Sequence, residues 1–216
     1  MRDAFHRELE NLDQEIVRMG ALVEQSTQLA TTALLEGDET LAQKVRDGDE
    51  AIDGVFMDIE KRALTLLAQQ APVAGDLRLI VAILRVVNDL ERAGDLTYNI
   101  AKLSQGEDFR RPDLKEVRLL ISELGKAAGR LIGEAIDSWA TKDERLAADI
   151  ARQDDQIDDL HARLIEKLVE LKGQESLGPA LRLALVGRYF ERIGDHAVNL
   201  GERVRYYVTG DEEHLG

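Results

Sequence analysis

Residues 5–36 read FHRELENLDQEIVRMGALVEQSTQLATTALLE, and apolar side chains recur along this stretch every three or four positions. That spacing matches the turn of an α-helix, so the apolar side chains form one stripe along about eight turns. The stripe consists of Phe5, Leu9, Leu12, Ile16, Met19, Leu22, Leu29 and Ala33, with Ser26 as a small polar interruption. A long helix with one apolar face buries that face against other helices, so the stretch predicts a helical bundle.

The same periodicity continues beyond residue 36, interrupted by short polar segments. Gly37 breaks the first helix, and Asp38 is placed as the N-cap of a second helix that ends near Gln70. Further helices are predicted at about residues 73–103, 113–140 and 143–172, and a sixth follows with Ser176 as its N-cap. We therefore expect an all-α fold of six long antiparallel helices, each spanning about 45 Å.

The composition agrees with this fold class. The 216 residues include 4% aromatic residues, 32% charged residues and 3 prolines, which favours packed amphipathic helices over a sandwich or barrel. There are no cysteines, which excludes a disulfide scaffold, a thiolate metal site and a cysteine nucleophile.

The charge balance bears on partners and location. The formal net charge is −14 and no segment concentrates Lys and Arg, so nucleic acid is not an expected partner. Residues 2–8 lack the apolar core of an export signal, and charges interrupt the most apolar stretch, Leu77–Leu90. We expect a cytoplasmic protein without direct membrane insertion.

The second half of the chain repeats the first. A shift of 105 residues carries Asp38 onto Asp143 and Ile52 onto Ile157, and a shift of 100 residues carries Glu91 onto Glu191. Two matching blocks separated by one short deletion indicate an internal duplication. The expected organisation is two tandem three-helix bundles, residues 1–106 and residues 112–210.

Each half carries two acid pairs with a spacing of four residues. The pairs are Asp49/Asp53 and Glu91/Asp95 in the first half, and Asp154/Asp158 and Glu191/Asp195 in the second. Residues four apart lie on one helix face, so two neighbouring helices would bring four carboxylates together. Two carboxylates about 6 Å apart repel by roughly 3 kcal/mol at an effective dielectric constant of 20. Protonation, an arginine or a cation has to offset that repulsion.

Two interpretations of the acid pairs stay open on spacing alone. Oxygen ligands suit Mg²⁺, Ca²⁺, Mn²⁺ or iron, and the helix-interior glycines Gly94 and Gly194 leave room for a ligand or a facing helix. Alternatively Arg92, Arg188 and Arg192 neutralise the acids in ordinary ion pairs. His196 is expected to cap a helix or lie on the surface, because its counterpart in the first half is Leu96. Trp139 is expected in the core.

Three segments resemble a known family signature. Residues 89–100 (DLERAGDLTYNI), 189–200 (YFERIGDHAVNL) and 71–78 (APVAGDLR) resemble the signature of the PhoU family. The resemblance covers essentially the whole chain in two repeats. Ala93 departs from it, since the family usually has a larger apolar residue there.

The resemblance implies a function and a set of site residues. PhoU proteins are accessory proteins of phosphate transport and negative regulators of phosphate uptake and of the phosphate-starvation response, the Pho regulon. They are thought to link the ATPase subunit of the phosphate ABC transporter to a phosphate-sensing histidine kinase, and homodimers are common. Some bind iron or zinc clusters at an acidic motif. By this resemblance the motif falls on Glu91, Asp95, Glu191 and Asp195, with Asp49, Asp53, Asp154 and Asp158 as the facing acids.

Two other functions are weighed against this one. A di-iron carboxylate enzyme in a helical bundle uses Glu-x-x-His motifs, and neither acid cluster contains one, so catalysis is not expected. A structural helical spacer without any ligand is the second alternative, in which the clustered acids and the helix-interior glycines would be accidental.

Overall fold

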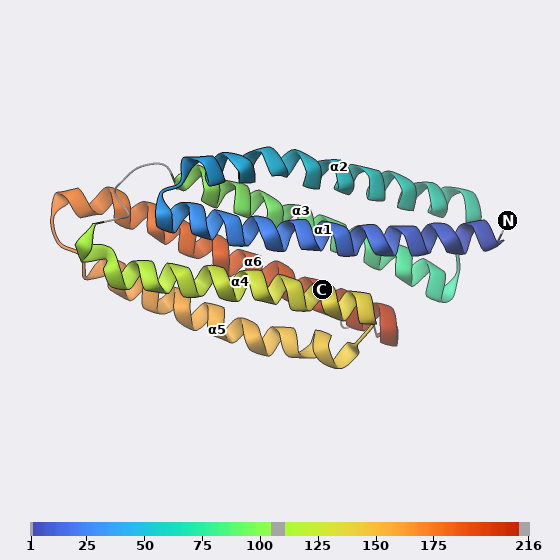
Figure 1. Cartoon of the computed structure of the whole chain (residues 1–216). Helices are drawn as coiled ribbons and strands as arrows, with labels where there is room; N and C mark the ends of the chain where they lie inside the picture. The colour runs from blue at the N-terminus through green and yellow to red at the C-terminus, as the bar shows by residue number, and fades with distance from the viewer. Residues whose placement is uncertain (1, 105–110, 212–216) are drawn as a thin grey trace.

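The computed structural model describes residues 2–104 and 111–211, and helices dominate this part of the chain (Figure 1). The helices are α1 (Arg2–Glu36), α2 (Glu39–Gln70), α3 (Ala74–Leu103), α4 (Lys115–Thr141), α5 (Glu144–Val169) and α6 (Leu177–Thr209). Two short 3₁₀ turns, η2 (Pro112–Leu114) and η3 (Gln174–Ser176), precede α4 and α6. The predicted all-α fold of six long helices is confirmed.

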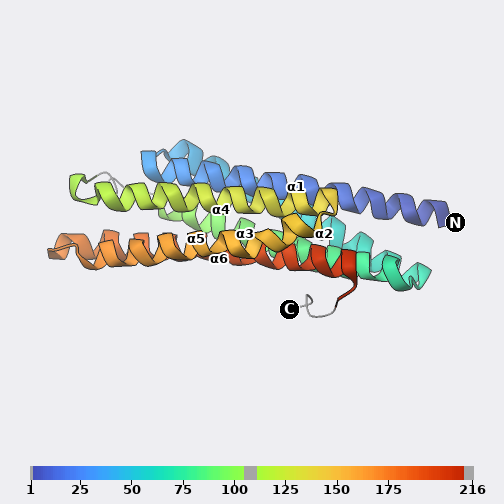
Figure 2. The same cartoon turned by 90° about the horizontal axis from the view of Figure 1, so that it is seen from below.

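The six helices form an elongated bundle with one continuous core. Helices α1, α2 and α3 pack on one another, and α4, α5 and α6 do the same. The two groups meet through α1 against α4 and α3 against α6, which leaves α2 and α5 on opposite outer sides (Figure 1). Figure 2, in which the molecule is seen from below, shows α4 running alongside α1. The division into repeats of residues 1–106 and 112–210 stays a prediction.

The N-termini of α2 and α5 are built in the same way. The Asp38 carboxylate accepts hydrogen bonds from the backbone N–H groups of Thr40 and Leu41, at 2.9 and 3.0 Å. The Asp143 carboxylate accepts from Arg145 and Leu146 at 2.9 and 3.1 Å. Each aspartate thus satisfies helix N–H groups that have no partner within the helix. The predicted cap at Asp38 is confirmed, and the repeat reproduces it.

Ser176 occupies the N-cap position of α6 as predicted, but its side chain makes no capping hydrogen bond, because its hydroxyl donates to the Lys172 carbonyl at 2.9 Å. Two other predicted boundaries differ from the structure. Helix α5 ends at Val169 rather than 172, ahead of a turn in which Gly173 takes a φ of 95°. Pro112 opens the 3₁₀ turn η2, and α4 begins only at Lys115.

Helices α1 and α4 approach closely where glycines replace larger side chains. A Cβ atom on Gly125 would overlap the side chain of Thr31, and one on Gly20 would overlap Ile136. The 105-residue shift carries Gly20 onto Gly125 and Thr31 onto Ile136, so these are equivalent contacts. Gly133 lies against Glu24 and Gly129 against Gln28 in the same reciprocal pattern. A pseudo-two-fold axis therefore relates the two halves across the α1–α4 contact.

We predict that Gly125→Ala lowers the free energy of unfolding by about 1–3 kcal/mol, because Thr31 is branched next to the backbone and cannot turn away. Urea unfolding followed by circular dichroism measures this change. Gly54→Ala on α2 is the matched control, since a Cβ there meets nothing within 4 Å. The control is expected to gain about 0.5–1 kcal/mol from higher helix propensity. A Gly125→Ala protein as stable as the control variant would contradict the close contact.

Candidate functional site

The acid pairs of the first half come together between α2 and α3. Burial, together with the smaller effects of the charges of Asp53 and Asp95, raises the pKa of Asp49 to about 6. Burial also raises the pKa of Glu91, with added contributions from Asp95 and Asp53, while Arg92 opposes the shift. Because the carboxylates of α2 and α3 act on one another, the four predicted acids share one place in the fold.

The second half repeats this cluster between α5 and α6. Burial is the largest cause that raises the pKa of Asp154 to about 6, and the charges of Asp158 and Asp195 contribute to the same shift. Glu191 is ion-paired with Arg188 one turn earlier on α6. Asp158 and Asp195 are exposed, so the cluster opens to solvent on one side. The structure therefore brings together Asp154, Asp158 and Asp195, while Glu191 lies one turn before Asp195 on α6 and pairs with Arg188.

Glycines on α3 and α6 let the facing helices approach the acids. A Cβ on Gly94 would lie 3.3 Å from Ile52 and 3.9 Å from an Asp49 carboxylate oxygen. A Cβ on Gly194 would overlap the Asp154 carboxylate. The missing side chain at Gly194 therefore makes the space in which the Asp154 carboxylate sits. This contact explains why a helix-interior glycine, which costs about 1 kcal/mol, occurs there.

Two carboxylate oxygens of the second cluster are left without a hydrogen bond. Asp154 Oδ1 and Glu191 Oε2 are both buried, and neither has a partner in the described part of the chain. A buried carboxylate oxygen without a partner is costly, so a proton or a cation at this point would stabilise the cluster. The donor set is all oxygen, which suits hard and borderline metal ions.

The side chains do not form a finished metal site. Among residues 2–104 and 111–211, no three acidic, imidazole or thiolate groups are placed so that they could hold one metal ion together. In the second cluster the Glu191 carboxylate is paired with Arg188, which accounts for part of the difference between the predicted metal site and the observed arrangement. Both interpretations made from the sequence therefore have a structural counterpart, an arginine ion pair and a pair of unpartnered oxygens.

A polar contact between the halves was missed from the sequence. His196 does not lie on the surface as predicted but is buried, and its Nδ1 is 3.0 Å from a carboxylate oxygen of Asp89. Asn199 donates to the same oxygen at 3.2 Å. The pair joins α3 to α6 beside the two acid clusters. A signal was present in the repeat, because the equivalent positions hold the apolar Leu96 and the aromatic Tyr189, so both members change together.

The fold and the acid clusters define a class of protein: a duplicated all-helical bundle with facing acid pairs in each half. The PhoU domain family matches residues 16–104 and again residues 121–204. The chain belongs to the PhoU family, as the sequence resemblance implied. No helix in the described part of the chain combines the length and apolar character that crossing a membrane requires.

Named relatives and solved structures agree with this assignment. The chain is 35% identical to the phosphate-specific transport system accessory protein PhoU homolog 2 of Mycobacterium tuberculosis, covering 97% of this chain and 99% of that protein. It is 37% identical to a PhoU homolog of Pseudomonas putida, covering 98% of this chain and 84% of that protein. The crystal structure of PhoU from Pseudomonas aeruginosa superposes with a TM-score of 0.90 at 32% identity, covering 96% of this chain and all of that one.

We predict that Asp154→Asn stabilises the metal-free protein at neutral pH by about 1 kcal/mol, after allowance for solvent screening. The folded pKa of about 6 lies above the ordinary aspartate pKa of 3.8, so the folded state binds more protons than the unfolded state between these values. The carboxyl of Asp154 therefore contributes to stability while it is protonated, below the unfolded pKa, and this contribution is lost as the pH rises through 6. Urea unfolding in chelator at pH above and below this window measures the difference.

The stabilisation by Asp154→Asn should disappear on the acid side of the window, where the wild-type carboxyl is also neutral. Asp159→Asn, an exposed change on the same helix, is the matched control. An Asp154→Asn protein that is less stable than wild type in chelator at neutral pH would show that the charged carboxylate does not destabilise the fold.

Proposed function

We propose that the chain is a cytoplasmic, non-catalytic regulator of phosphate transport that restrains uptake and the phosphate-starvation response. The observation that carries the proposal is the match to accessory proteins of phosphate-specific transport systems along nearly the full length of both chains. The matched structure from Streptococcus pneumoniae is titled a phosphate transport system regulatory protein, with a TM-score of 0.85 at 28% identity.

In this proposal the protein acts as an adaptor. Its partners are the ATPase subunit of the phosphate ABC transporter and a phosphate-sensing histidine kinase, and the protein itself forms a homodimer. The arrangement of α2 and α5 on opposite outer sides supports an adaptor, since two similar faces are presented in different directions. The close packing of the six helices gives such an adaptor a rigid frame.

The acid clusters are proposed to bind metal. Asp154 and Glu191, with Asp158 and Asp195, would hold one ion, and the equivalent acids Asp49, Asp53, Glu91 and Asp95 would hold another. Iron or zinc is the first choice, and Mg²⁺, Mn²⁺ or Ca²⁺ fits the same oxygen donors. The unpartnered buried oxygens of Asp154 and Glu191 support this proposal. A bound cation would offset the repulsion between the carboxylates and brace one helix against the other.

We expect protein purified without chelator to contain metal, and Glu91→Ala/Glu191→Ala protein to contain much less of it. Each substitution removes one carboxylate ligand from each cluster. Inductively coupled plasma mass spectrometry measures metal per chain. Glu60→Ala/Glu166→Ala, which removes two exposed acids outside the clusters, is the matched control. Equal metal content in all three proteins would leave the alternative, a ligand-free spacer whose acids form ion pairs.

Deleting the gene is expected to raise the output of a phosphate-starvation reporter when phosphate is plentiful, because the restraint on the kinase is lost. Expression of the wild-type chain from a plasmid should restore repression. Reporter activity in phosphate-rich and phosphate-poor medium measures both effects. A deletion strain that responds to phosphate as the parent does would contradict the regulatory role.

A further inference from the structure

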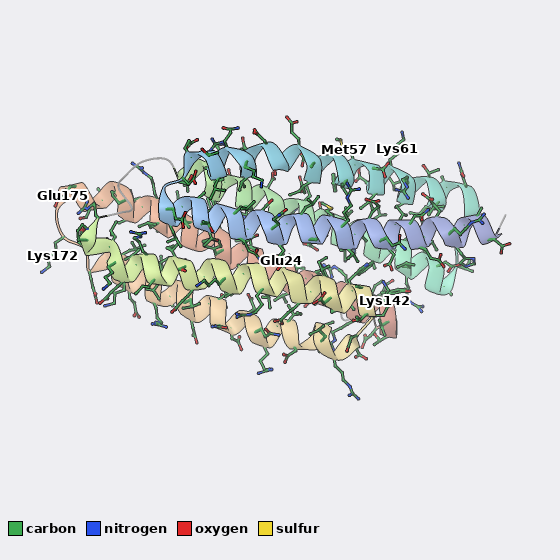
Figure 3. All side chains as sticks on the ribbon, in the orientation of Figure 1. Glu24, Met57, Lys61, Lys142, Lys172 and Glu175 are labelled. Carbon is green, nitrogen blue, oxygen red and sulfur yellow. The ribbon has the colours of Figure 1, made fainter. Side chains whose placement is uncertain are left out.

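A groove follows the contact between α1 and α4 on the outside of the molecule. It consists of three adjoining hollows, and neighbouring hollows share lining residues. The hollow at the start of α4 has a volume of about 440 Å³ and is lined by Leu35, Arg111, Pro112, Lys115, Arg118, Leu119 and Ser122. The middle hollow adds Lys126, and the far hollow contains Glu24, which Figure 3 labels between α1 and α4.

The half of the groove nearest the start of α4 is basic. Arg111, Lys115, Arg118 and Lys126 line its two hollows, and no acidic residue of the described part of the chain does so. Arg111 is ion-paired with Asp113 at 2.7 Å, so the uncompensated charge comes from the other three residues. Arg118 donates to the Leu35 carbonyl at 2.6 Å, a neutral acceptor that fixes the guanidinium without cancelling its charge. Lys115 and Lys126 are exposed and form no ion pair with the described residues. Such a concentration of positive charge is unexpected in a chain whose net charge is −14.

The other half of the groove does not share this charge, although the fold is duplicated. The 105-residue shift carries Lys115, Arg118 and Lys126 back onto Glu10, Asp13 and Ala21. The far hollow is lined by Glu24, Glu134 and Asp137 together with Lys126 and Arg130, and Arg130 lies 3.9 Å from Glu134 in an ion pair. The groove therefore runs from hollows whose charged lining residues are all basic to a hollow whose charged lining residues are of both signs, so its two ends differ for a bound segment.

The basic half also offers apolar surface. Leu119 is a large apolar side chain with 58% of its surface exposed, and Leu35 and Pro112 lie beside it. An open hollow with an apolar floor is a poor site for a small hydrated anion, which needs several converging donors. It suits a peptide segment that places an apolar side chain on the floor and acidic side chains against the rim.

We propose that the basic half of the α1–α4 groove receives an acidic, leucine-containing segment of a partner protein. This inference rests on the proposed adaptor function and names the surface by which one partner docks. The segment's carboxylates would pair with Lys115, Arg118 and Lys126, and its apolar side chain would cover Leu119. In the far hollow, Glu24 and Asp137 would repel the same segment and so fix its direction.

Fluorescence anisotropy tests the proposal with a labelled synthetic helix of about 14 residues that carries leucine at helical spacing and glutamate elsewhere. We expect Lys115→Glu/Lys126→Glu to weaken binding of this peptide about tenfold or more, and Leu119→Asn to weaken it several-fold. Lys44→Glu/Lys61→Glu on α2 changes the net charge equally and should bind as wild type does. Figure 3 labels Lys61 on the outer helix α2, away from the groove. A peptide with glutamine in place of glutamate should not bind.

Several outcomes would overturn the proposal. If the groove variant and the α2 variant weaken peptide binding equally, the effect is due to net charge and not to the groove. Displacement of the peptide by inorganic phosphate at equimolar concentration would indicate a small-anion site. A dimer that light scattering detects in the wild type and not in Lys115→Glu/Lys126→Glu would make a second copy the occupant. The regulatory role is judged separately: full repression by the groove variant in the deletion strain, with no peptide binding, removes the docking surface and leaves that role intact.

Discussion

The close approach of α1 and α4 at paired glycines sets the frame for the whole molecule. Gly20 and Gly125 have no side chain where Ile136 and Thr31 need space, so the helix axes come together and the two halves share one core. With α1 and α4 fixed, α3 and α6 meet across the same pseudo-two-fold axis. These are the helices that carry Glu91 and Glu191. A contact remote from the acids thus determines how the two clusters lie relative to each other.

The acid clusters illustrate a conflict that the bundle tolerates. Close packing between helices stabilises the fold, yet it partly buries Asp49 and Asp154 and raises the pKa of each to about 6. Each cluster lies between helices of one half and stays open to solvent through Asp95 or Asp195. The repulsion is therefore kept moderate, and the carboxylates remain accessible to a proton or cation. In a fully buried cluster, the free energy needed to desolvate the carboxylates would exceed the stabilisation gained from helix packing.

The local features of the fold could be predicted from the sequence because each depends on neighbours in the chain. The apolar stripe of α1 and the cap at Asp38 belong to this group, and so do the acid pairs, whose spacing fixes a common helix face. The Asp89–His196 contact depends on how α3 meets α6 across the pseudo-two-fold axis, and no local pattern states that arrangement. Ser176 misled for a related reason: its hydroxyl had a nearer acceptor in the preceding turn, the Lys172 carbonyl.

The places where the two halves differ bear on the choice of partners. Residues kept in both halves have other roles: the capping aspartates Asp38 and Asp143 satisfy demands that any three-helix unit makes, and the acid clusters are the proposed metal sites. Differences such as Lys115 against Glu10 lie on an exposed surface, where folding does not require either charge. A duplicated chain begins with two equal faces and can bind two different partners only after those faces diverge. The charge difference along the α1–α4 groove is the kind of divergence that an adaptor with two distinct partners requires.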